Sequence, residues 1–313
     1  MTDILHILKS ILTLIGIFSL FLYIYIFIQY MRYKKAIEMS IDNNLQTGEI
    51  YSHPEIIDLP IPTQKDTKCD FKVARYLADL IVRVRKGVDE PLIEPHTLEN
   101  ELNMYDDKNN LFGVLFSNDD IAYIVFRGTN WNDNKSRINN LYFFQRSFNN
   151  TNKNKQQIDF YSNLDNIPAG IHSGFLKVYN IFRDELLDKI EEINPKQIII
   201  GGHSLGGAIG TICGLELKIM GYDVVVYNFS CPCVGDNVFC ELVTNSKLPL
   251  YRIINTCDVA QVFPVSVIPN FDYPSQPFIY THCGETIYFT DNWKSLFNNH
   301  LMNVYIKWLD EQQ

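Results

Sequence analysis

The feature that most constrains the fold is a glycine-rich turn between an apolar strand and a helix. The strand is predicted over Ile198–Ile200, and the turn from Gly201 to Gly207 follows it directly. Residues from about 205 to 219 are then predicted to be helical. A short run of isoleucines is typical of a strand buried on both faces, as in a parallel sheet covered by helices. This stretch therefore predicts an α/β domain.

The segments on either side of the turn continue the alternation of helix and strand. Apolar residues at three- and four-residue spacing predict two amphipathic helices, at about residues 66–86 and 175–190. Short apolar runs predict four strands, at residues 111–116, 121–126, 224–229 and 250–254, of which the first two form a hairpin. Together these elements favour a mainly parallel central sheet flanked by helices, in one domain from residue 66 to residue 313.

The composition agrees with a packed domain and argues against some functions. Of the 313 residues, 46% are hydrophobic, and the formal net charge is −9. Since a basic surface for a phosphate backbone is not expected, nucleic-acid binding is disfavoured. The seven cysteines match neither a small disulfide framework nor a paired zinc motif. We expect mostly free thiols and no metal site, and we leave open another role for Cys231 and Cys233.

The N-terminal region has the pattern of a membrane span. No charged residue lies between Lys9 and Arg32. A helix over residues 10–31 would reach about 33 Å, enough for a hydrocarbon core of roughly 30 Å. A cleaved signal peptide fits less well, because the apolar run is long and no small-x-small site follows it. A buried core helix would be hard to enclose in a chain of this size. We expect one transmembrane helix within an anchor, residues 1–35.

The charges beside this span predict its orientation. Arg32, Lys34 and Lys35 follow the span directly, whereas Lys9 is the only Lys or Arg before it. The side richer in Lys and Arg usually stays cytosolic. Residues 36–65 are polar and contain prolines, which predicts a tether. We therefore expect a single-pass membrane protein whose larger domain lies on the cytosolic side.

The glycine-rich turn has the form Gly-x-Ser-x-Gly, with Ser204 at its centre. Between a strand and a helix, this motif makes a strained turn that lifts the serine hydroxyl out of the sheet. Its glycines avoid collisions with the neighbouring strand and helix. Ser204 is therefore a candidate nucleophile. The alternative is a turn that packs or binds phosphate at the helix N-terminus, although a phosphate loop would carry a lysine nearby.

A serine nucleophile needs a base and an orienting carboxylate, and after this type of turn the acid and then a histidine follow along the chain. Asp258 comes just after the predicted strand at 250–254 and fits the acid. His282 and His300 follow it. Because His300 opens a predicted C-terminal helix and would project from a fixed position, we favour it as the base. We expect His282 to be a packing or hydrogen-bonding residue.

Two backbone segments are candidates for an oxyanion hole, which needs two preorganised N–H donors. One donor is the backbone N–H of Leu205, directly after Ser204. The other is expected from the loop Arg127-Gly128-Thr129 after the second hairpin strand, with the Thr129 hydroxyl as a further donor. A plain turn is the alternative for this loop.

Taken in order, these motifs resemble the fungal-type (class 3) lipase family. The resemblance rests on Ile124–Thr129, Ile171–Phe175, Gly202–Ala208, Asn255 with Asp258, and Asn299-His300. It implies an α/β-hydrolase fold, no cofactor, a triad of Ser204, Asp258 and His300, and oxyanion donors on Thr129 and Leu205. One departure concerns packing near the acid loop. Such lipases usually carry Phe-Gly-Ala-Pro-Arg-Val-Gly where this chain has Phe229-Ser230-Cys231-Pro232-Cys233-Val234-Gly235.

The resemblance also implies a hinged lid, here over residues 130–148, for which an ordinary core helix is the alternative. The expected activity is hydrolysis of acylglycerol esters at a membrane or lipid surface through an acyl-enzyme. A phospholipase or a general carboxylesterase would share the triad. A catalytically silent membrane scaffold would share the fold but would not need the triad.

Overall fold

A seven-stranded sheet is the centre of the part of the chain that the computed structural model describes. The described residues are 68–86, 98–106, 109–118, 120–129, 145–147, 169–264, 266–268 and 278–312. The strand order is β1-β2-β3-β6-β7-β8-β11. Their bounds are Glu99–Tyr105, Leu111–Asn118, Ile121–Phe126, Gln197–His203, Val224–Phe229, Leu250–Asn255 and Glu285–Phe289. Neighbours from β3 to β11 pair in parallel, and β1 and β2 extend the sheet antiparallel, which confirms the mainly parallel sheet.

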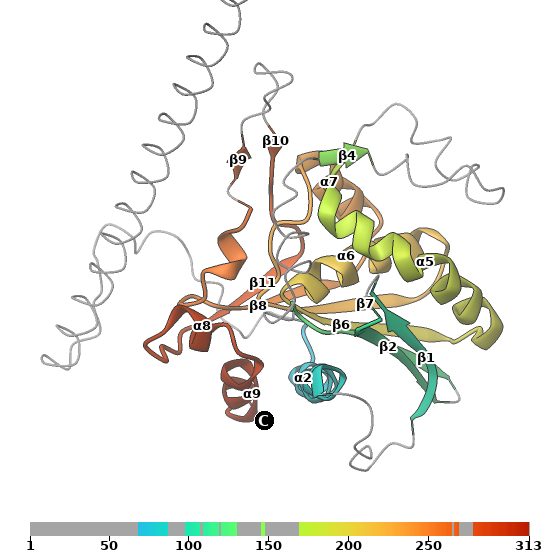
Figure 1. Cartoon of the computed structure of the whole chain (residues 1–313), viewed down its shortest axis with the longest axis horizontal. Helices are drawn as coiled ribbons and strands as arrows, with labels where there is room; N and C mark the ends of the chain where they lie inside the picture. Colours follow the sequence, from blue (N-terminus) through green and yellow to red (C-terminus); the bar gives the residue numbers. More distant parts are fainter. Residues whose placement is uncertain are drawn as a thin grey trace, which may run out of the picture. The chain divides into compact units, whose positions relative to one another are not determined.

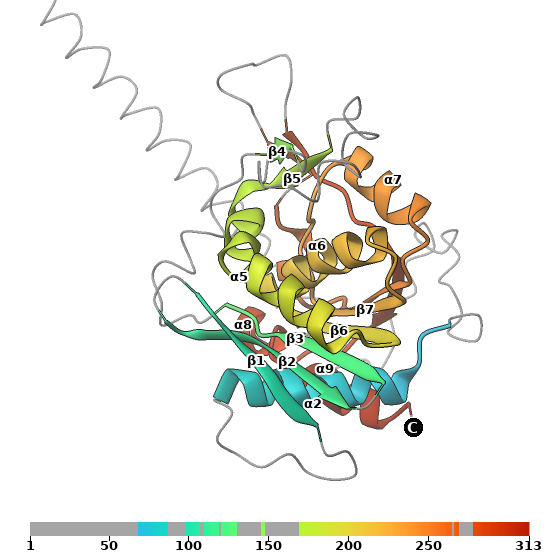
Figure 2. The same ribbon diagram turned by 90° about the vertical axis from the view of Figure 1, so that its right-hand side faces the viewer.

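Helices cover both faces of this sheet (Figure 1, Figure 2). One face carries α5 (Ser173–Ile193), α6 (Leu205–Ile219) and α7 (Asn237–Asn245), and the other carries α2 (Phe71–Lys86) and α9 (Met302–Asp310). Each face has its own apolar core. Ile198 and Ile200 of β6 pack in the core beneath α5 and α6, while Ile199 packs in the core beside α2 and α9. The predicted burial of this strand on both faces is confirmed.

The helices α2 and α9 pack against each other on their face of the sheet. Arg75 Nε donates to Asp310 Oδ1 at 2.6 Å. The Phe71 ring meets the Trp308 ring edge-on, with 5.5 Å between centroids. Because His300 lies two residues before α9, this packing fixes where the turn that carries His300 can lie.

Some bounds and elements differ from the prediction. α2 begins at Phe71 and not near residue 66, because the Asp70 carboxylate accepts from the N–H groups of Lys72 and Val73, at 2.9 and 3.2 Å, and caps the helix there. His300 does not open the C-terminal helix. It lies in the turn between α8 (Leu296–Asn299) and α9. The sequence patterns also do not predict β1, α7 or β11.

Short elements complete the described part: η3 (Ala260–Val262), β9 (Val267–Ile268) paired with β10 (Phe278–Ile279), and β4 (Gln145–Ser147) paired with β5 (Gly170–His172). The predicted span at residues 10–31, the tether at 36–65, and the predicted lid at 130–148 except for β4 lie outside the described residues. Within the described ranges, no helix has both the length and the apolar character needed to cross a bilayer.

Candidate active site

Ser204 stands on the turn between β6 and α6. Its φ of 55° and ψ of −125° are strained for a residue with a side chain. Two glycines allow this turn. A Cβ on Gly202 would lie 2.3 Å from the Gly206 carbonyl oxygen in α6, and a Cβ on Gly206 would lie 2.5 Å from the carbonyl oxygens of Phe126 and Arg127 at the end of β3. The expected collisions with the neighbouring strand and helix are confirmed.

Three side chains form a chain of hydrogen bonds at the carboxyl edge of the sheet. Ser204 Oγ donates to His300 Nε2 at 2.9 Å, and His300 Nδ1 donates to Asp258 Oδ2 at 2.8 Å. The residues follow β6, α8 and β8, respectively. Because parallel strands end at one edge, residues 96 and 42 positions apart meet there. The structure thus brings these three predicted site residues into contact.

Asp258 is buried and accepts hydrogen bonds on both carboxylate oxygens. Besides His300, Oδ2 accepts from the hydroxyls of Ser230 at 2.5 Å and Tyr305 at 2.8 Å. Oδ1 accepts from the Ala260 N–H at 2.9 Å. Burial alone would raise the pKa of Asp258. The hydrogen bond and charge of His300, with the bonds from Ser230 and Ala260, outweigh burial and hold this pKa below its ordinary value. The carboxylate is therefore ionised at neutral pH and can stabilise a protonated imidazole.

Two buried asparagines tie the acid turn to the histidine turn. Asn255 Nδ2 donates to the carbonyls of Asp291 and Asn299, at 2.8 and 3.3 Å. Asn299 Nδ2 donates to the Cys257 carbonyl at 3.0 Å, and its Oδ1 accepts from the Trp293 N–H at 2.7 Å. Both asparagines belong to the motifs found in the sequence, but those motifs do not predict these hydrogen bonds. The only sequence signal is that each lies within three residues of Asp258 or His300.

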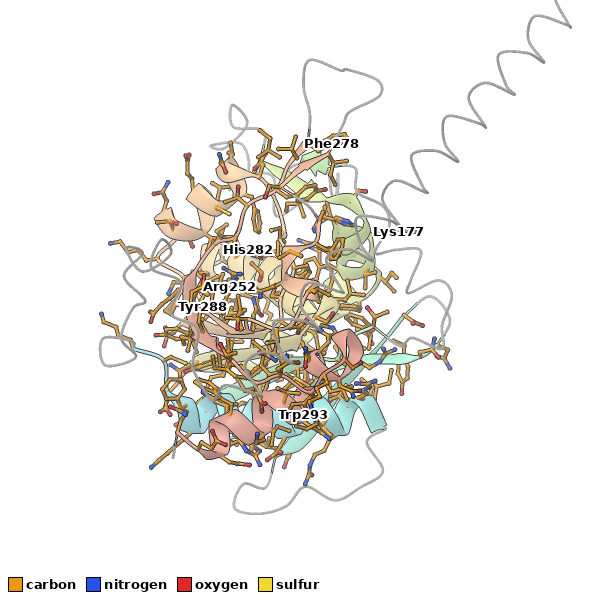
Figure 3. The ribbon with its side chains drawn as sticks, turned by 90° about the vertical axis from the view of Figure 1, so that its left-hand side faces the viewer. Lys177, Arg252, Phe278, His282, Tyr288 and Trp293 are labelled. Atoms are coloured by element: carbon orange, nitrogen blue, oxygen red, sulfur yellow. The ribbon has the colours of Figure 1, made fainter. Side chains whose placement is uncertain are left out.

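His282, the other candidate for the base, has a different environment. Its Nε2 donates to the Gln261 carbonyl at 2.8 Å. It lies beside Arg252 (Figure 3), and burial together with the charge of Arg252 lowers the pKa of His282 to about 4. His282 is therefore a hydrogen-bonding residue, as its sequence position indicates. His300 is the histidine in contact with Ser204.

His203, the residue before Ser204, supports the other side of the His300 turn. Its Nε2 donates to the His300 carbonyl at 2.9 Å, and the two rings lie 4.6 Å apart between centroids. Burial lowers the pKa of His203 to about 3, so the ring is neutral and adds no charge beside His300. Sequence reasoning assigns no role to this residue.

The loop after β3 passes beside Ser204. A Cβ on Gly128 would lie 3.3 Å from the Ser204 Cβ, so the loop approaches the turn closely. Arg127 Nη1 donates to the Gly128 carbonyl at 2.9 Å and supports the loop from within. Thr129 follows on this loop, and Leu205 begins α6; both side chains are buried. The two candidate oxyanion donors thus come from segments on either side of the serine turn.

The segment that departs from the lipase pattern is packed against the site. Ser230 has a φ of 51°, and its hydroxyl contacts both Asp258 and His300. Cys231 and Cys233 are buried, and burial raises their thiol pKa values to about 12 and about 11. None of the seven cysteines, all of which lie in the described ranges, forms a disulfide. In the part of the chain that the structure describes, no cluster of His, Cys, Asp or Glu has the arrangement of a metal site.

Comparison with known proteins shows what the domain is similar to. The sequence profile of the family described as lipase (class 3) matches residues 123–267. This match supports the resemblance of residues 123–267 to the class 3 lipase family. A lipase from Rhizomucor miehei is 30% identical over 131 residues, which are 39% of this chain and 33% of that protein. Phospholipase A(1) DAD1, chloroplastic, from Arabidopsis thaliana is 31% identical over 124 residues, 35% of this chain and 28% of that protein.

Solved structures of lipases share the fold of this domain. A triacylglycerol lipase, whose catalytic centre is described as a serine protease triad, has a TM-score of 0.52 and 22% identity, covering 71% of this chain and 80% of that chain. This likeness supports the α/β-hydrolase fold. The chain spans about a third of the length of the curated relatives it matches.

Proposed function

We propose that the protein is a serine ester hydrolase that acts on acylglycerol esters at a membrane or lipid surface. The observation that carries the proposal is the hydrogen-bond chain from Ser204 through His300 to Asp258 on a strained strand-to-helix turn. In such a chain the imidazole accepts the serine proton, and the carboxylate stabilises the charge that forms. The similarity to lipases supports the same reaction class.

In the proposed reaction, Ser204 Oγ attacks the ester carbonyl carbon while His300 Nε2 takes the hydroxyl proton. The backbone N–H of Leu205 and the Thr129 donors stabilise the oxyanion. When the intermediate collapses, His300 returns the proton to the leaving alcohol, and the acyl group stays on Ser204. Water then attacks the acyl carbon and gives its proton to His300. The fatty acid leaves as that proton returns to Ser204.

Exposed apolar side chains that follow the acid turn along the chain support action at a lipid surface. Val262 and Phe263 follow Asp258 within five residues, and both are exposed. Val267 of β9 and Ile279 of β10 are a register pair and are exposed as well. Exposed apolar side chains of this kind can contact lipid or another apolar surface.

We also propose that residues 10–31 cross the membrane once, that residues 36–65 are a tether, and that the domain lies on the cytosolic side. The uncharged run and the basic residues from Arg32 to Lys35 support this arrangement. A tether would hold the site at the surface where insoluble esters are, and so raise the local substrate concentration.

A phospholipase is the second candidate, favoured by the similarity over 124 residues to the chloroplastic phospholipase A(1). A general carboxylesterase needs the same catalytic groups. A catalytically silent scaffold is disfavoured, because it would not need Ser204, His300 and Asp258 together. The acyl pocket and the residues around it would distinguish a phospholipase or a general carboxylesterase from an acylglycerol lipase.

The test uses the full-length chain in mild detergent. A fluorophosphonate probe should label the wild-type protein and spare Ser204→Ala. The same preparation is then given emulsified diacylglycerol, triacylglycerol and phosphatidylcholine, and released fatty acid is measured. Preference for the acylglycerols supports the first candidate, and preference for phosphatidylcholine supports the second. A wild-type protein that neither binds the probe nor hydrolyses any ester would refute the proposal.

A further inference from the structure

Ser230 occupies a position set by the order of the strands. It directly follows β7, which lies between β6 and β8 in the sheet. The Ser204 N–H donates to the Phe229 carbonyl at 2.9 Å, and the Ser230 N–H donates to the Ile253 carbonyl at 3.1 Å. Because β6 leads to Ser204 and β8 leads to Asp258, the residue after β7 stands between the nucleophile turn and the acid turn.

The Ser230 hydroxyl is fully buried and contacts both members of the acid–base pair. Its Oγ lies 2.5 Å from Asp258 Oδ2 and 2.9 Å from His300 Nδ1. An ionised carboxylate only accepts, so the single hydroxyl proton of Ser230 points to Asp258, and its lone pairs face Nδ1. The hydrogen of a neutral imidazole is then favoured on Nδ1. This leaves Nε2 as the acceptor for the Ser204 hydroxyl.

The backbone of Ser230 disfavours a side chain. Its φ of 51° lies in the left-handed region, where glycine is accepted without strain and residues with a Cβ are uncommon. Packing alone would therefore be met as well by glycine. The contacts of the hydroxyl are what distinguish serine from glycine at this position.

We propose that Ser230 is a positioning residue for hydrolysis, which fixes the tautomer of His300 and the orientation of the Asp258 carboxylate. The inference rests on the proposed function, since it concerns the same acid–base pair. Ser230 acts through these two side chains and not on the reacting ester. The contribution of its hydrogen bond to the lowered pKa of Asp258 is consistent with this role.

Two variants test the proposal in the full-length chain in mild detergent. Ser230→Gly removes the hydroxyl at a backbone position that suits glycine, and Ser230→Ala removes it while keeping the Cβ. In both, kcat for 4-nitrophenyl butyrate should fall about tenfold to a hundredfold, the range expected for loss of a hydrogen bond to a charged group. KM should change little. The rate of fluorophosphonate labelling at Ser204 should fall with kcat.

The pH dependence of kcat/KM is a second test, because a purely structural role of Ser230 would leave it unchanged. Without the Ser230 donor, the Asp258 carboxylate attracts the proton of the pair more strongly, so the acid limb of kcat/KM should move to higher pH. Among the described residues, the other titratable groups that face the pair are the neutral ring of His203 from β6, the Tyr305 hydroxyl from α9 and Cys257 on the acid turn. They are unchanged in both variants, so a shift reports the missing hydroxyl.

Ser117→Ala is the matched control. Ser117 is a buried serine on β2 that donates to the Glu101 carboxylate on β1, away from the site. This variant should lose thermal stability while kcat and the pH profile stay at the wild-type values. Ser230→Gly should show the reverse, with melting near the wild-type temperature and a lower kcat.

The outcomes separate this inference from the proposed function. If the wild type is labelled and active, but both Ser230 variants keep its kcat and pH profile, the positioning role is wrong and the function stands. If both variants fail to fold, Ser230 is a residue on which the fold depends, and the inference is also wrong. If the wild type itself is neither labelled nor active, the function and the inference fall together.

Discussion

His172→Asn should make the stability of the domain less sensitive to acid. His172 precedes α5, and its Nδ1 accepts from the N–H groups of Gly174 and Phe175 at 3.1 and 3.3 Å. The ring is fully buried and stacks on Phe175, 3.9 Å between centroids. Burial lowers its pKa to about 4. An Nδ1 that accepts hydrogen bonds must be unprotonated, so the folded state requires a neutral ring.

The magnitude follows from the difference in bound protons. In the unfolded chain a histidine has a pKa of about 6.5. Between that value and the folded pKa of about 4, the unfolded state binds the proton and the folded state does not. The stability that His172 contributes is therefore present above pH 6.5 and is lost as the pH falls. At pH 5 the loss is about 2 kcal/mol, a large part of an ordinary unfolding free energy.

Asparagine is a suitable replacement, because it is a favoured N-cap residue that does not titrate. The free energy of unfolding is measured by urea denaturation of both proteins at pH 7 and at pH 5. The wild type should lose about 2 kcal/mol more than the variant over this interval. All other titrating groups are shared, so they cancel in the difference. Equal losses in the two proteins would refute the assignment of a neutral, buried His172.

The remaining predictions concern catalysis and the membrane. Ser204→Ala should keep the melting temperature nearly unchanged and lower ester hydrolysis by several powers of ten; equal probe labelling of variant and wild type would contradict this. His300→Ala should lose turnover with little loss of stability, and His282→Ala should lose about 1–3 kcal/mol of stability while staying active; the opposite pattern in activity and melting assays would exchange their roles. The full-length chain should stay in membranes washed with alkaline carbonate, and release by the wash would exclude the anchor. A chain starting at Asp66 should remain active on dispersed short-chain esters but lose relative activity on bilayer lipid; undiminished activity on bilayers would show that the tether is not needed.

Local patterns in the sequence predict the centre of the fold well. The strand β6, the Ser204 turn and α6 are contiguous, and the pattern of residues 198–219 predicts the buried strand, the glycine turn and the bounds of the helix. The hairpin of β2 and β3 is similar, because its two apolar runs and its turn are adjacent in the chain. Each of these elements is continuous in the chain, so the local sequence pattern predicts its type and its bounds.

Elements that depend on distant partners are not visible in the sequence. β1 is missed for a different reason: its partner β2 is the next strand along the chain, but residues 99–105 are mostly polar and do not have the apolar pattern of a strand. The contact of Ser230 with Asp258 and His300 exists only because β7 lies between β6 and β8. The hydrogen bonds of Asn255 and Asn299 likewise join the acid turn to the histidine turn, which lie more than 40 residues apart in the sequence. Spacing along the chain does not reveal which ends of strands meet.

The packing of α2 against α9 also bears on synthesis at the ribosome. The Ser204 turn needs residues up to Phe229, because the Ser204 N–H donates to the Phe229 carbonyl. His300 follows Ser204 by 96 residues, and its turn is fixed only once α9, through Asp310, has docked on α2. A nascent chain that stops short of Asp310 therefore carries its serine without a positioned base. The proposed hydrolysis therefore begins only after α9 has docked on α2.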